Sequence, residues 1–103
     1  MEELSNAIAG SFQPAATGQT IDNMSSVTGE RLATIPRSDA QDVDDAVTAA
    51  RAALHGEWGQ TTVAERADLL EAVAGVIEDR LEELAAVESR DTGKPFRLAA
   101  TID

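Results

Sequence analysis

The chain has 103 residues, which is the length of one domain at most. It contains no cysteine, and this excludes disulfides, thiolate metal sites and a cysteine nucleophile from these residues. Asp and Glu number 19 against 8 Lys and Arg, so the net charge is −11, and such a surface repels nucleic acid and anionic lipid.

The acidic balance has two interpretations. Lys94 is the only lysine, and abundant acids with scarce lysine are typical of a protein adapted to high salt. An ordinary acidic protein could instead carry its excess on one strongly acidic face; we favour the first interpretation. No apolar stretch approaches the roughly 18 residues that span a membrane, and residues 1–5 lack the hydrophobic run of a signal peptide. We therefore expect a cytoplasmic protein with no membrane or nucleic-acid partner.

Residues 1–37 form a strand and turn region, because they are rich in Ser, Thr, Gly and Ala with short apolar alternations. Turns are predicted at residues 17–19 and 27–30. Strands are predicted over residues 6–12, 20–24 and 31–35. Strands this short do not close a core alone, so they need a sheet edge or a helix to pack against.

Residues 38–103 form a helical region. Ser38, followed three residues later by Gln41, predicts a capping box at the start of the first helix. Apolar residues then recur at helical spacing until Gly56, which ends the helix. Trp58 follows, and we expect it to fill the corner before the next helix.

A second long helix is predicted to start at Thr62, which has an acid three residues later. The sequence leaves open whether this helix runs to Ser89 or breaks near Arg80. Gly93 is a plausible C-terminal stop, and Pro95 suits the first turn of a short last helix. The expected fold of the chain as an isolated fragment is thus α+β: short N-terminal β-strands plus a helical hairpin and a short C-terminal helix, together one partial domain.

Acidic side chains crowd the middle of this second helical stretch. Glu78 and Glu82 are four residues apart, as are Asp79 and Glu83, so like charges would face each other on adjacent turns of a continuous helix. Glu82 and Glu83 could also supply half of an acid/base pair. We favour a solvated acidic face.

Seven blocks of sequence stand in an order that matches one enzyme family, and the match covers about residues 7 to 103. One departure is visible, since Ser25-Ser26 stands where that family usually has Asn-Pro. The blocks are Ile8 to Phe12, Thr28 to Glu30, Leu32 to Pro36, Asp42 to Leu54, Trp58 with Glu65 to Ala67, Ile77-Glu78 with Glu83 to Ala85, and Asp91 to Pro95. The chain therefore resembles the N-terminal segment of the NAD(P)-dependent aldehyde dehydrogenase superfamily.

The resemblance implies a parent enzyme that oxidises an aldehyde to a carboxylic acid with NAD or NADP. In the family a cysteine thiolate attacks the aldehyde and a glutamate activates water. Neither has a counterpart here, so we expect no catalytic and no cofactor-binding residue in this chain. In the family this segment forms the outer part of the α/β Rossmann-type cofactor domain and helps cover its sheet. The expected partner is then the remainder of a dehydrogenase subunit or another subunit.

Two other roles stay open at this point. The short chain could be a stand-alone small acidic interaction module without enzymatic activity. It could also be a truncated gene product with no independent role. The sequence names neither the aldehyde nor the preferred nicotinamide cofactor.

The resemblance also suggests two weak sites. Some family members hold an alkali cation with an acid matching Asp91 and backbone carbonyls matching Asn23 and Met24, completed by residues outside these 103. Oxygen ligands suit such a hard cation, but we favour a simpler role in which Asp91 caps or braces the turn that follows it. Ile102 matches a position near the substrate tunnel, although alone it lines nothing.

Four further side chains could carry chemistry. His55 could be a general base, yet its place in the last turn of a helix gives it an electrostatic reason to be there. Asp42, Asp44 and Asp45 could ligate Mg²⁺, although acids are also favoured in the first turn of a helix. In both cases we favour the structural role.

The first prediction is that the 103-residue chain has no dehydrogenase activity, because it lacks the cysteine that the family's chemistry needs. With NAD or NADP and a panel of aldehydes, absorbance at the reduced-nicotinamide band should not rise above a protein-free blank. Turnover that persists after repeated purification would overturn this expectation.

Overall fold

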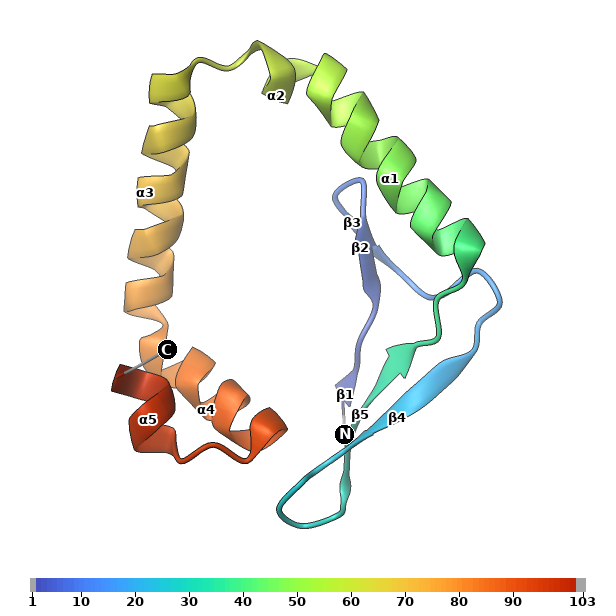
Figure 1. Ribbon diagram of the computed structural model, residues 1–103, viewed down its shortest axis with the longest axis vertical. Coiled ribbons are helices and arrows are strands. Elements are labelled where there is room, and N and C mark those ends of the chain that lie inside the picture. Colours follow the sequence, from blue (N-terminus) through green and yellow to red (C-terminus); the bar gives the residue numbers. More distant parts are fainter. Residues whose placement is uncertain (1, 102–103) are drawn as a thin grey trace. The chain divides into compact units, whose positions relative to one another are not determined.

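The computed structural model describes residues 2–101 (Figure 1). Strands occupy the N-terminal third and helices the remainder, which confirms the expected α+β class. The strands are β1 (Glu2–Glu3), β2 (Asn6–Ile8), β3 (Ser11–Gln13), β4 (Thr20–Met24) and β5 (Arg31–Pro36). The helices are α1 (Ala40–His55), α2 (Glu57–Gln60), α3 (Val63–Asp79), α4 (Leu81–Thr92) and α5 (Phe96–Thr101).

Two small sheets share the strands. One has the order β1-β5-β4, with β1 parallel to β5 and β4 antiparallel to it. The other is a hairpin of β2 and β3, closed by Ala9 and Gly10, whose φ angles are 54° and 80°. Positive φ at both central residues defines the turn type that matches the twist of a hairpin. Residues 6–12, expected as one strand, therefore fold back at Ala9-Gly10.

The first helix begins one residue later than expected. Asp39 is its N-cap, and its side chain accepts hydrogen bonds from the backbone N–H groups of Gln41 and Asp42. Asp42 in turn accepts from the Asp39 backbone, so the capping box is Asp39 with Asp42 rather than Ser38 with Gln41. Gly56 ends the helix as predicted, and the capping box at Thr62 of α3 is also as predicted.

The second helical stretch breaks at Arg80, which separates α3 from α4. The guanidinium of Arg80 binds both carboxylate oxygens of Glu83, at 2.9 and 2.6 Å. Glu78 and Glu82 therefore lie on opposite sides of the break, and the same holds for Asp79 and Glu83. The expected placement of these acids on successive turns of one continuous helix is therefore wrong. Glu83 forms an ion pair instead, which adds little stability because both partners are more than half exposed.

A glycine and a proline separate the last two helices. Gly93 ends α4 in the left-handed region, with φ 79°, and its N–H donates to the Ser89 carbonyl. Pro95 precedes α5, and its carbonyl accepts from the backbone N–H groups of Leu98 and Ala99. Gly93 ends α4 as expected, whereas Pro95 lies one residue before α5 rather than in its first turn.

The chain divides into two compact units that cut across the boundary between strands and helices. The first comprises residues 1–24 and 31–60, and the second comprises residues 25–30 and 61–103. In the first unit α1 packs against β2, while α4 and α5 pack against each other in the second. The short turn over residues 25–30 thus belongs with the C-terminal helices.

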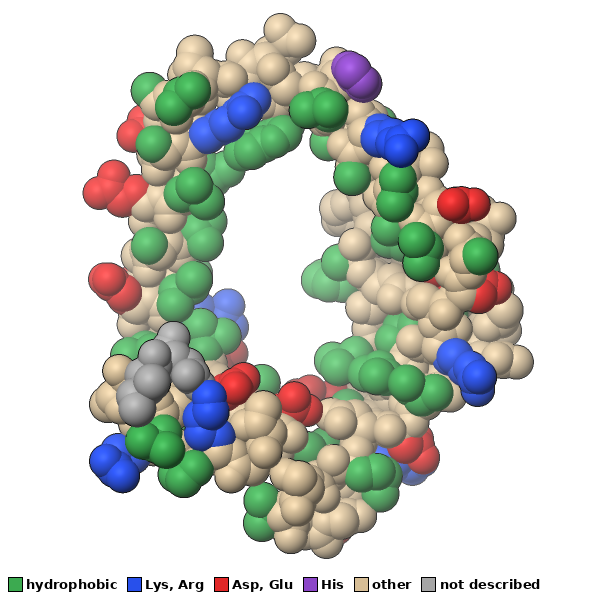
Figure 2. All heavy atoms as spheres, viewed as in Figure 1, with side chains coloured by type: hydrophobic (Ala, Val, Ile, Leu, Met, Phe, Trp, Pro, Cys, Tyr) green, Lys and Arg blue, Asp and Glu red, His purple; other side chains and the backbone are tan. Residues whose placement is uncertain are grey.

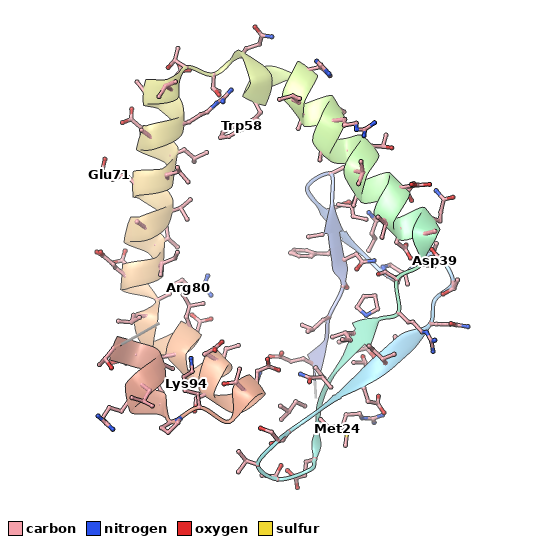
Figure 3. All side chains as sticks on the ribbon, in the orientation of Figure 1. Met24, Asp39, Trp58, Glu71, Arg80 and Lys94 are labelled. Carbon is pink, nitrogen blue, oxygen red and sulfur yellow. The ribbon has the colours of Figure 1, made fainter. Side chains whose placement is uncertain are left out.

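Neither unit has a core of large side chains among the described residues. The buried apolar residues there are alanines: Ala15, Ala33, Ala85 and Ala99. On α3 the hydrophobic side chains gather along one side and the acidic ones along the opposite side (Figure 2), with Glu71 on the acidic side (Figure 3). The apolar side consists of residues that are 46–68% exposed: Leu69, Leu70, Val73, Val76 and Ile77.

Two glycines give a matched test of this local packing. A Cβ on Gly59 would lie 1.7 Å from the Leu54 carbonyl oxygen, whereas a Cβ on Gly75, inside α3, would meet no described atom within 4 Å. Gly75→Ala should stabilise the chain by about 0.5–1 kcal/mol through helix propensity. Gly59→Ala should destabilise it by about 1–3 kcal/mol, because the corner between α1 and α2 must open.

Thermal unfolding followed by helical circular dichroism checks both substitutions. The thermal midpoint should rise for Gly75→Ala and fall for Gly59→Ala relative to the unchanged chain. Equal midpoints for the two variants would contradict the close approach of α2 to the end of α1.

Candidate functional site

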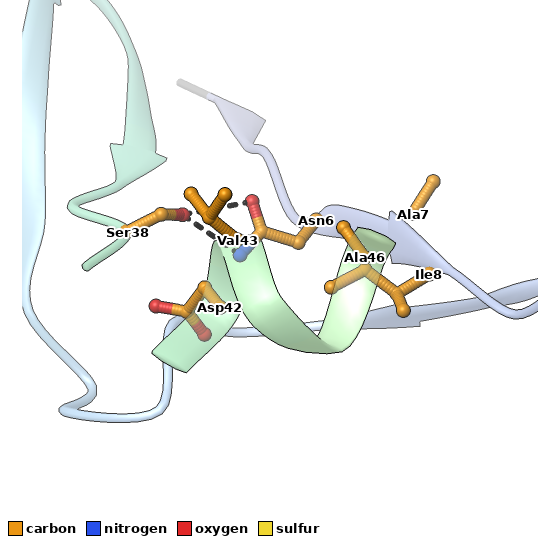
Figure 4. A pocket seen from close by; sticks show the side chains of 7 residues that line it. All are labelled: Asn6, Ala7, Ile8, Ser38, Asp42, Val43 and Ala46. Atoms are coloured by element: carbon orange, nitrogen blue, oxygen red, sulfur yellow. Dashed lines mark hydrogen bonds between the residues drawn. The ribbon is translucent and has the colours of Figure 1, made fainter. Parts of the chain in front are cut away.

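A shallow pocket of about 200 Å³ lies where β2 meets the start of α1 (Figure 4). Asn6 and Ser38 exchange hydrogen bonds at its edge, at 2.9 and 3.1 Å. The remaining lining residues are Ala7, Ile8, Asp42, Val43 and Ala46. The pocket therefore offers a mostly apolar floor with one carboxylate beside it.

That carboxylate, Asp42, is 6% exposed and already has its partners. One oxygen accepts from the backbone N–H of Ala16 and the other from that of Asp39, each at 2.9 Å. The hydrogen bond from the Asp39 backbone, followed by that from Ala16, holds the pKa of Asp42 below its ordinary value, since both bonds favour the charged form. Asp42 thus ties the loop before β4 to the start of α1, and it acts as a structural clasp.

The other acids near the start of α1 do not join Asp42 in a metal site. Asp44 and Asp45 are exposed, and Asp45 accepts from the side-chain amide of Gln41 at 2.9 Å. Within residues 2–101, three or more His, Cys, Asp or Glu side chains are nowhere grouped to hold a metal ion. Asp42 is the acid in the first turn of α1, whereas Asp44 and Asp45 lie beyond that turn and are exposed.

The proposed alkali-cation ligands are divided between the two compact units. Asn23 and Met24 lie at the end of β4, where the pairing with β5 is irregular, and they belong to the first unit. Asp91 lies in the last turn of α4 in the second unit. The cation set stays a prediction. Ile102, the expected tunnel residue, lies outside the described residues.

The turn over residues 25–30 keeps a defined form without the usual Asn-Pro. The hydroxyl of Ser25 accepts from the backbone N–H groups of Val27 and Thr28, at 3.2 and 3.1 Å. The Ser25 carbonyl accepts from Gly29, and the Ser25 N–H donates to the Glu30 carbonyl. A serine hydroxyl therefore closes the turn, which is a known role of this side chain.

The segment from Asp91 to Pro95 is a closely bonded helix connector. The Thr92 hydroxyl donates to the Glu88 carbonyl at 2.8 Å and accepts from the Lys94 N–H at 3.2 Å. The Ser89 hydroxyl donates to the Lys94 carbonyl at 2.6 Å. Hydroxyl side chains of the last turn of α4 therefore hold the backbone of Lys94 against the end of that helix.

The remaining candidates occupy exposed positions. His55 is the last residue of α1, where a cation would meet the negative end of the helix dipole. Glu82 is exposed in the first turn of α4, and the hydrogen bond from Arg80 lowers the pKa of Glu83. A carboxylate held in its charged form suits an ion pair better than a general acid. Sequence reasoning missed the Asp42 clasp, although Asp39, three residues earlier, gives the spacing of a capping box.

Comparison with known proteins identifies the fold. The sequence pattern of the aldehyde dehydrogenase family matches residues 12–103. The chain belongs to the aldehyde dehydrogenase family. It is 42% identical over 103 residues to the 2-hydroxymuconic semialdehyde dehydrogenase of Pseudomonas sp. (strain CF600), covering all of this chain and 21% of that protein. It is 44% identical over 98 residues to the acetaldehyde dehydrogenase of Pseudomonas aeruginosa, covering 95% of this chain and 19% of that protein.

Solved aldehyde dehydrogenases share the fold of this chain. The NAD⁺ complex of the Bacillus cereus enzyme superposes with a TM-score of 0.94 at 39% identity, covering 98% of this chain and 21% of that one. The chain thus spans about a fifth of the length of the relatives it matches and is homologous to the N-terminal part of aldehyde dehydrogenases. Across residues 2–101, helices long and apolar enough to cross a membrane do not occur.

Replacing Asp42 tests the clasp. Asp42→Asn keeps the size of the side chain but places an amide NH₂ where one carboxylate oxygen accepts a backbone N–H, so two donors would face each other. We expect the thermal midpoint to fall by several degrees. Asp45→Asn is the matched control, because its carboxylate accepts from an exposed side chain, and its midpoint should change little.

The same clasp predicts a pH dependence. The pKa of Asp42 is lower in the folded chain than its ordinary value of 3.8. Its contribution to stability is therefore complete above about pH 4 and is lost as the pH falls through the folded-state pKa. Asp42→Asn should lose less stability between pH 5 and pH 2 than the unchanged chain, in midpoints measured at several pH values. Parallel pH profiles would show that Asp42 does not act as a clasp.

Proposed function

We propose that these residues form the non-catalytic N-terminal part of an NAD(P)-dependent aldehyde dehydrogenase that oxidises an aldehyde to a carboxylic acid. Two observations support the proposal. The family match covers nearly the whole chain but only a fifth of its relatives. The helices also expose apolar sides that a complete subunit would cover, and this second observation carries the structural part of the proposal.

The distribution of side chains on α3 favours a covering partner. Its apolar side is about half exposed, while its acidic side carries Asp68, Glu71 and Glu78 toward solvent. Burying apolar surface contributes about 25 cal/mol per Å², so a partner that covers this side gains stability. A partner on the acidic side would have to remove carboxylates from water, which is costly. The apolar side is therefore the side that packs.

The second unit offers another apolar surface of the same kind. A groove on α3, α4 and α5 is lined by Ile77, Leu81, Leu84, Val87 and Ala99, and the ion pair between Lys94 and Glu88 lies at its edge. Leu81, Leu84 and Val87 are 41–48% exposed. Such a surface with charges at its margin suits packing against the remainder of the subunit.

In this proposal the chemistry lies in the rest of the subunit. A bound nicotinamide cofactor would accept the hydride, and a cysteine and a glutamate outside these residues would supply the nucleophile and the base. The 103 residues contribute by covering apolar surface of the cofactor domain and excluding water from it. NAD⁺ is the cofactor bound in the Bacillus cereus relative, which favours NAD as the first cofactor to assay.

The charge supports a proposal about the setting of the protein. A net charge of −11 with a single lysine fits a protein that works in high salt. Carboxylates concentrated on one side of α3 remain hydrated there and repel each other less as salt screens them. Enzyme activity that rises with NaCl up to about 1 M or beyond would support this setting.

The exposed apolar sides are also compatible with a stand-alone interaction module. The experiment that separates the two functions expresses the complete reading frame that contains these residues and measures reduction of NAD⁺ and NADP⁺ with a panel of aldehydes. Aldehyde-dependent reduction supports the dehydrogenase. A purified product that binds other proteins but reduces neither cofactor would favour the module.

Substitutions on the two sides of α3 test the covering role. In the 103-residue chain, Ile77→Ala should cost less than about 1 kcal/mol, because Ile77 is half exposed. In the longer protein it should cost about 2–5 kcal/mol, since the side chain would then be buried. Glu71→Ala, on the acidic side, is the control and should change stability little in either context.

Urea unfolding measures these differences. The proposal requires the cost of Ile77→Ala to grow strongly when the rest of the protein is present, while that of Glu71→Ala does not. An equal cost of Ile77→Ala in the two contexts would mean that this side of α3 stays open to solvent.

A further inference from the structure

The close approach of Ser26 and Val27 distinguishes Gly93 from the other described glycines with positive φ. A Cβ on Gly93 would lie 2.7 Å from the Ser26 hydroxyl oxygen and 3.3 Å from a methyl group of Val27. Gly10, Gly18 and Gly29 also have positive φ, but a Cβ on any of them would meet no described atom within 4 Å. Backbone conformation alone therefore accounts for those three glycines but not for Gly93.

A hydrogen bond accompanies this close approach. The Ser26 hydroxyl donates to the Thr92 carbonyl at 3.3 Å, across 66 positions of sequence. The Thr92 carbonyl belongs to the last turn of α4, whose carbonyls have no partner within the helix. Ser26 thus satisfies an acceptor that the end of α4 would otherwise leave to water.

The turn has its own internal bonds, and these do not hold it against α4. The Ser25 hydroxyl and carbonyl close the turn through Val27, Thr28 and Gly29, all within five residues. Ser26 makes a hydrogen bond from the turn to α4, and its hydroxyl lies where a side chain at position 93 would collide with it. The internal shape of the turn therefore depends on Ser25, whereas its attachment to α4 depends on Ser26.

We propose that the turn over residues 25–30 is a latch that closes on the C-terminal end of α4, and that Gly93 is required for closure because it leaves room for Ser26. With the latch closed, the turn moves with α4 and α5 as one body. With the latch open, Ser25 still closes the turn, but its amides fluctuate more freely. Gly93 thus has two roles: it ends α4 in the left-handed conformation, and it leaves room for Ser26 to contact the end of that helix.

Hydrogen exchange of the 103-residue chain tests this device with a matched pair of glycine variants. Gly93→Ala and Gly18→Ala impose similar backbone strain, since their φ angles are 79° and 73°. Only Gly93→Ala adds a clash with Ser26. The latch predicts that Gly93→Ala speeds amide exchange of Val27 and Thr28 by about two- to tenfold, the usual range for losing one such contact. Gly18→Ala should leave these amides unchanged.

A pair of serine variants tests the hydrogen bond separately. Ser26→Ala removes the donor to Thr92 and should speed exchange of the same amides. Ser11→Ala, which removes a hydroxyl that donates to the Ile8 carbonyl at 3.2 Å within its own hairpin, should not. If Gly93 only capped α4, its loss would speed exchange in the last turn of α4 and not at residues 27 and 28. Exchange at Val27 and Thr28 therefore distinguishes a latch from a helix cap alone.

A double variant decides the steric part of the proposal. In Gly93→Ala combined with Ser26→Gly, the nearest clash is removed, so Gly93→Ala should have a smaller effect on exchange there than in the unchanged chain. Unchanged exchange at Val27 and Thr28 in both Gly93→Ala and Ser26→Ala would overturn the latch. Additive effects in the double variant would overturn the requirement for room at position 93.

Discussion

Apolar surface on a helix must be covered by another element, and the described part of this chain supplies too few elements to cover its own. The side chains that are buried there are small, as Ala85 and Ala99 illustrate, while Leu69, Val73 and Ile77 remain about half exposed. Alanine removes little apolar area from water, so its burial contributes little to stability. The architecture is therefore held mainly by local structure, and its apolar sides favour a covering partner.

Local structure is correspondingly well specified. Side-chain caps satisfy the first turns of α1 and α3, through Asp39 with Asp42 and through Thr62 with Glu65. Asp42 also holds the loop that precedes β4, so one carboxylate serves both a helix end and a tertiary contact. Such hydrogen bonds give direction and register, whereas burial of large side chains gives most of the free energy of folding. Such hydrogen bonds are present within the described residues, whereas burial of large side chains is not.

The sequence predicted those features that depend on local chemistry. Gly56, Thr62 and Gly93 mark helix boundaries as expected, because caps and left-handed stops are encoded by residues next to each other. The helix break at Arg80 was left open, since neither a proline nor a glycine marks it in the sequence. The turn at Ala9-Gly10 was missed because alanine rarely adopts positive φ.

The candidate site was less predictable because its contacts join residues far apart in the sequence. The contacts of Asp42 with Ala16 and of Ser26 with Thr92 join positions 26 and 66 residues apart, and no pattern of neighbouring residues encodes them. The family resemblance, by contrast, was readable from ordered blocks, and the comparisons confirm it.

The central claim is that the chain leaves its apolar helix sides open to solvent. The heat capacity change of unfolding, measured by calorimetry on the 103-residue chain, tests this claim most directly, since it reports apolar surface exposed on unfolding. A chain that leaves its apolar sides open should fall well below the ~1.2–1.5 kcal/mol/K typical of a self-contained domain near this length, and a value within or above that range would contradict the account.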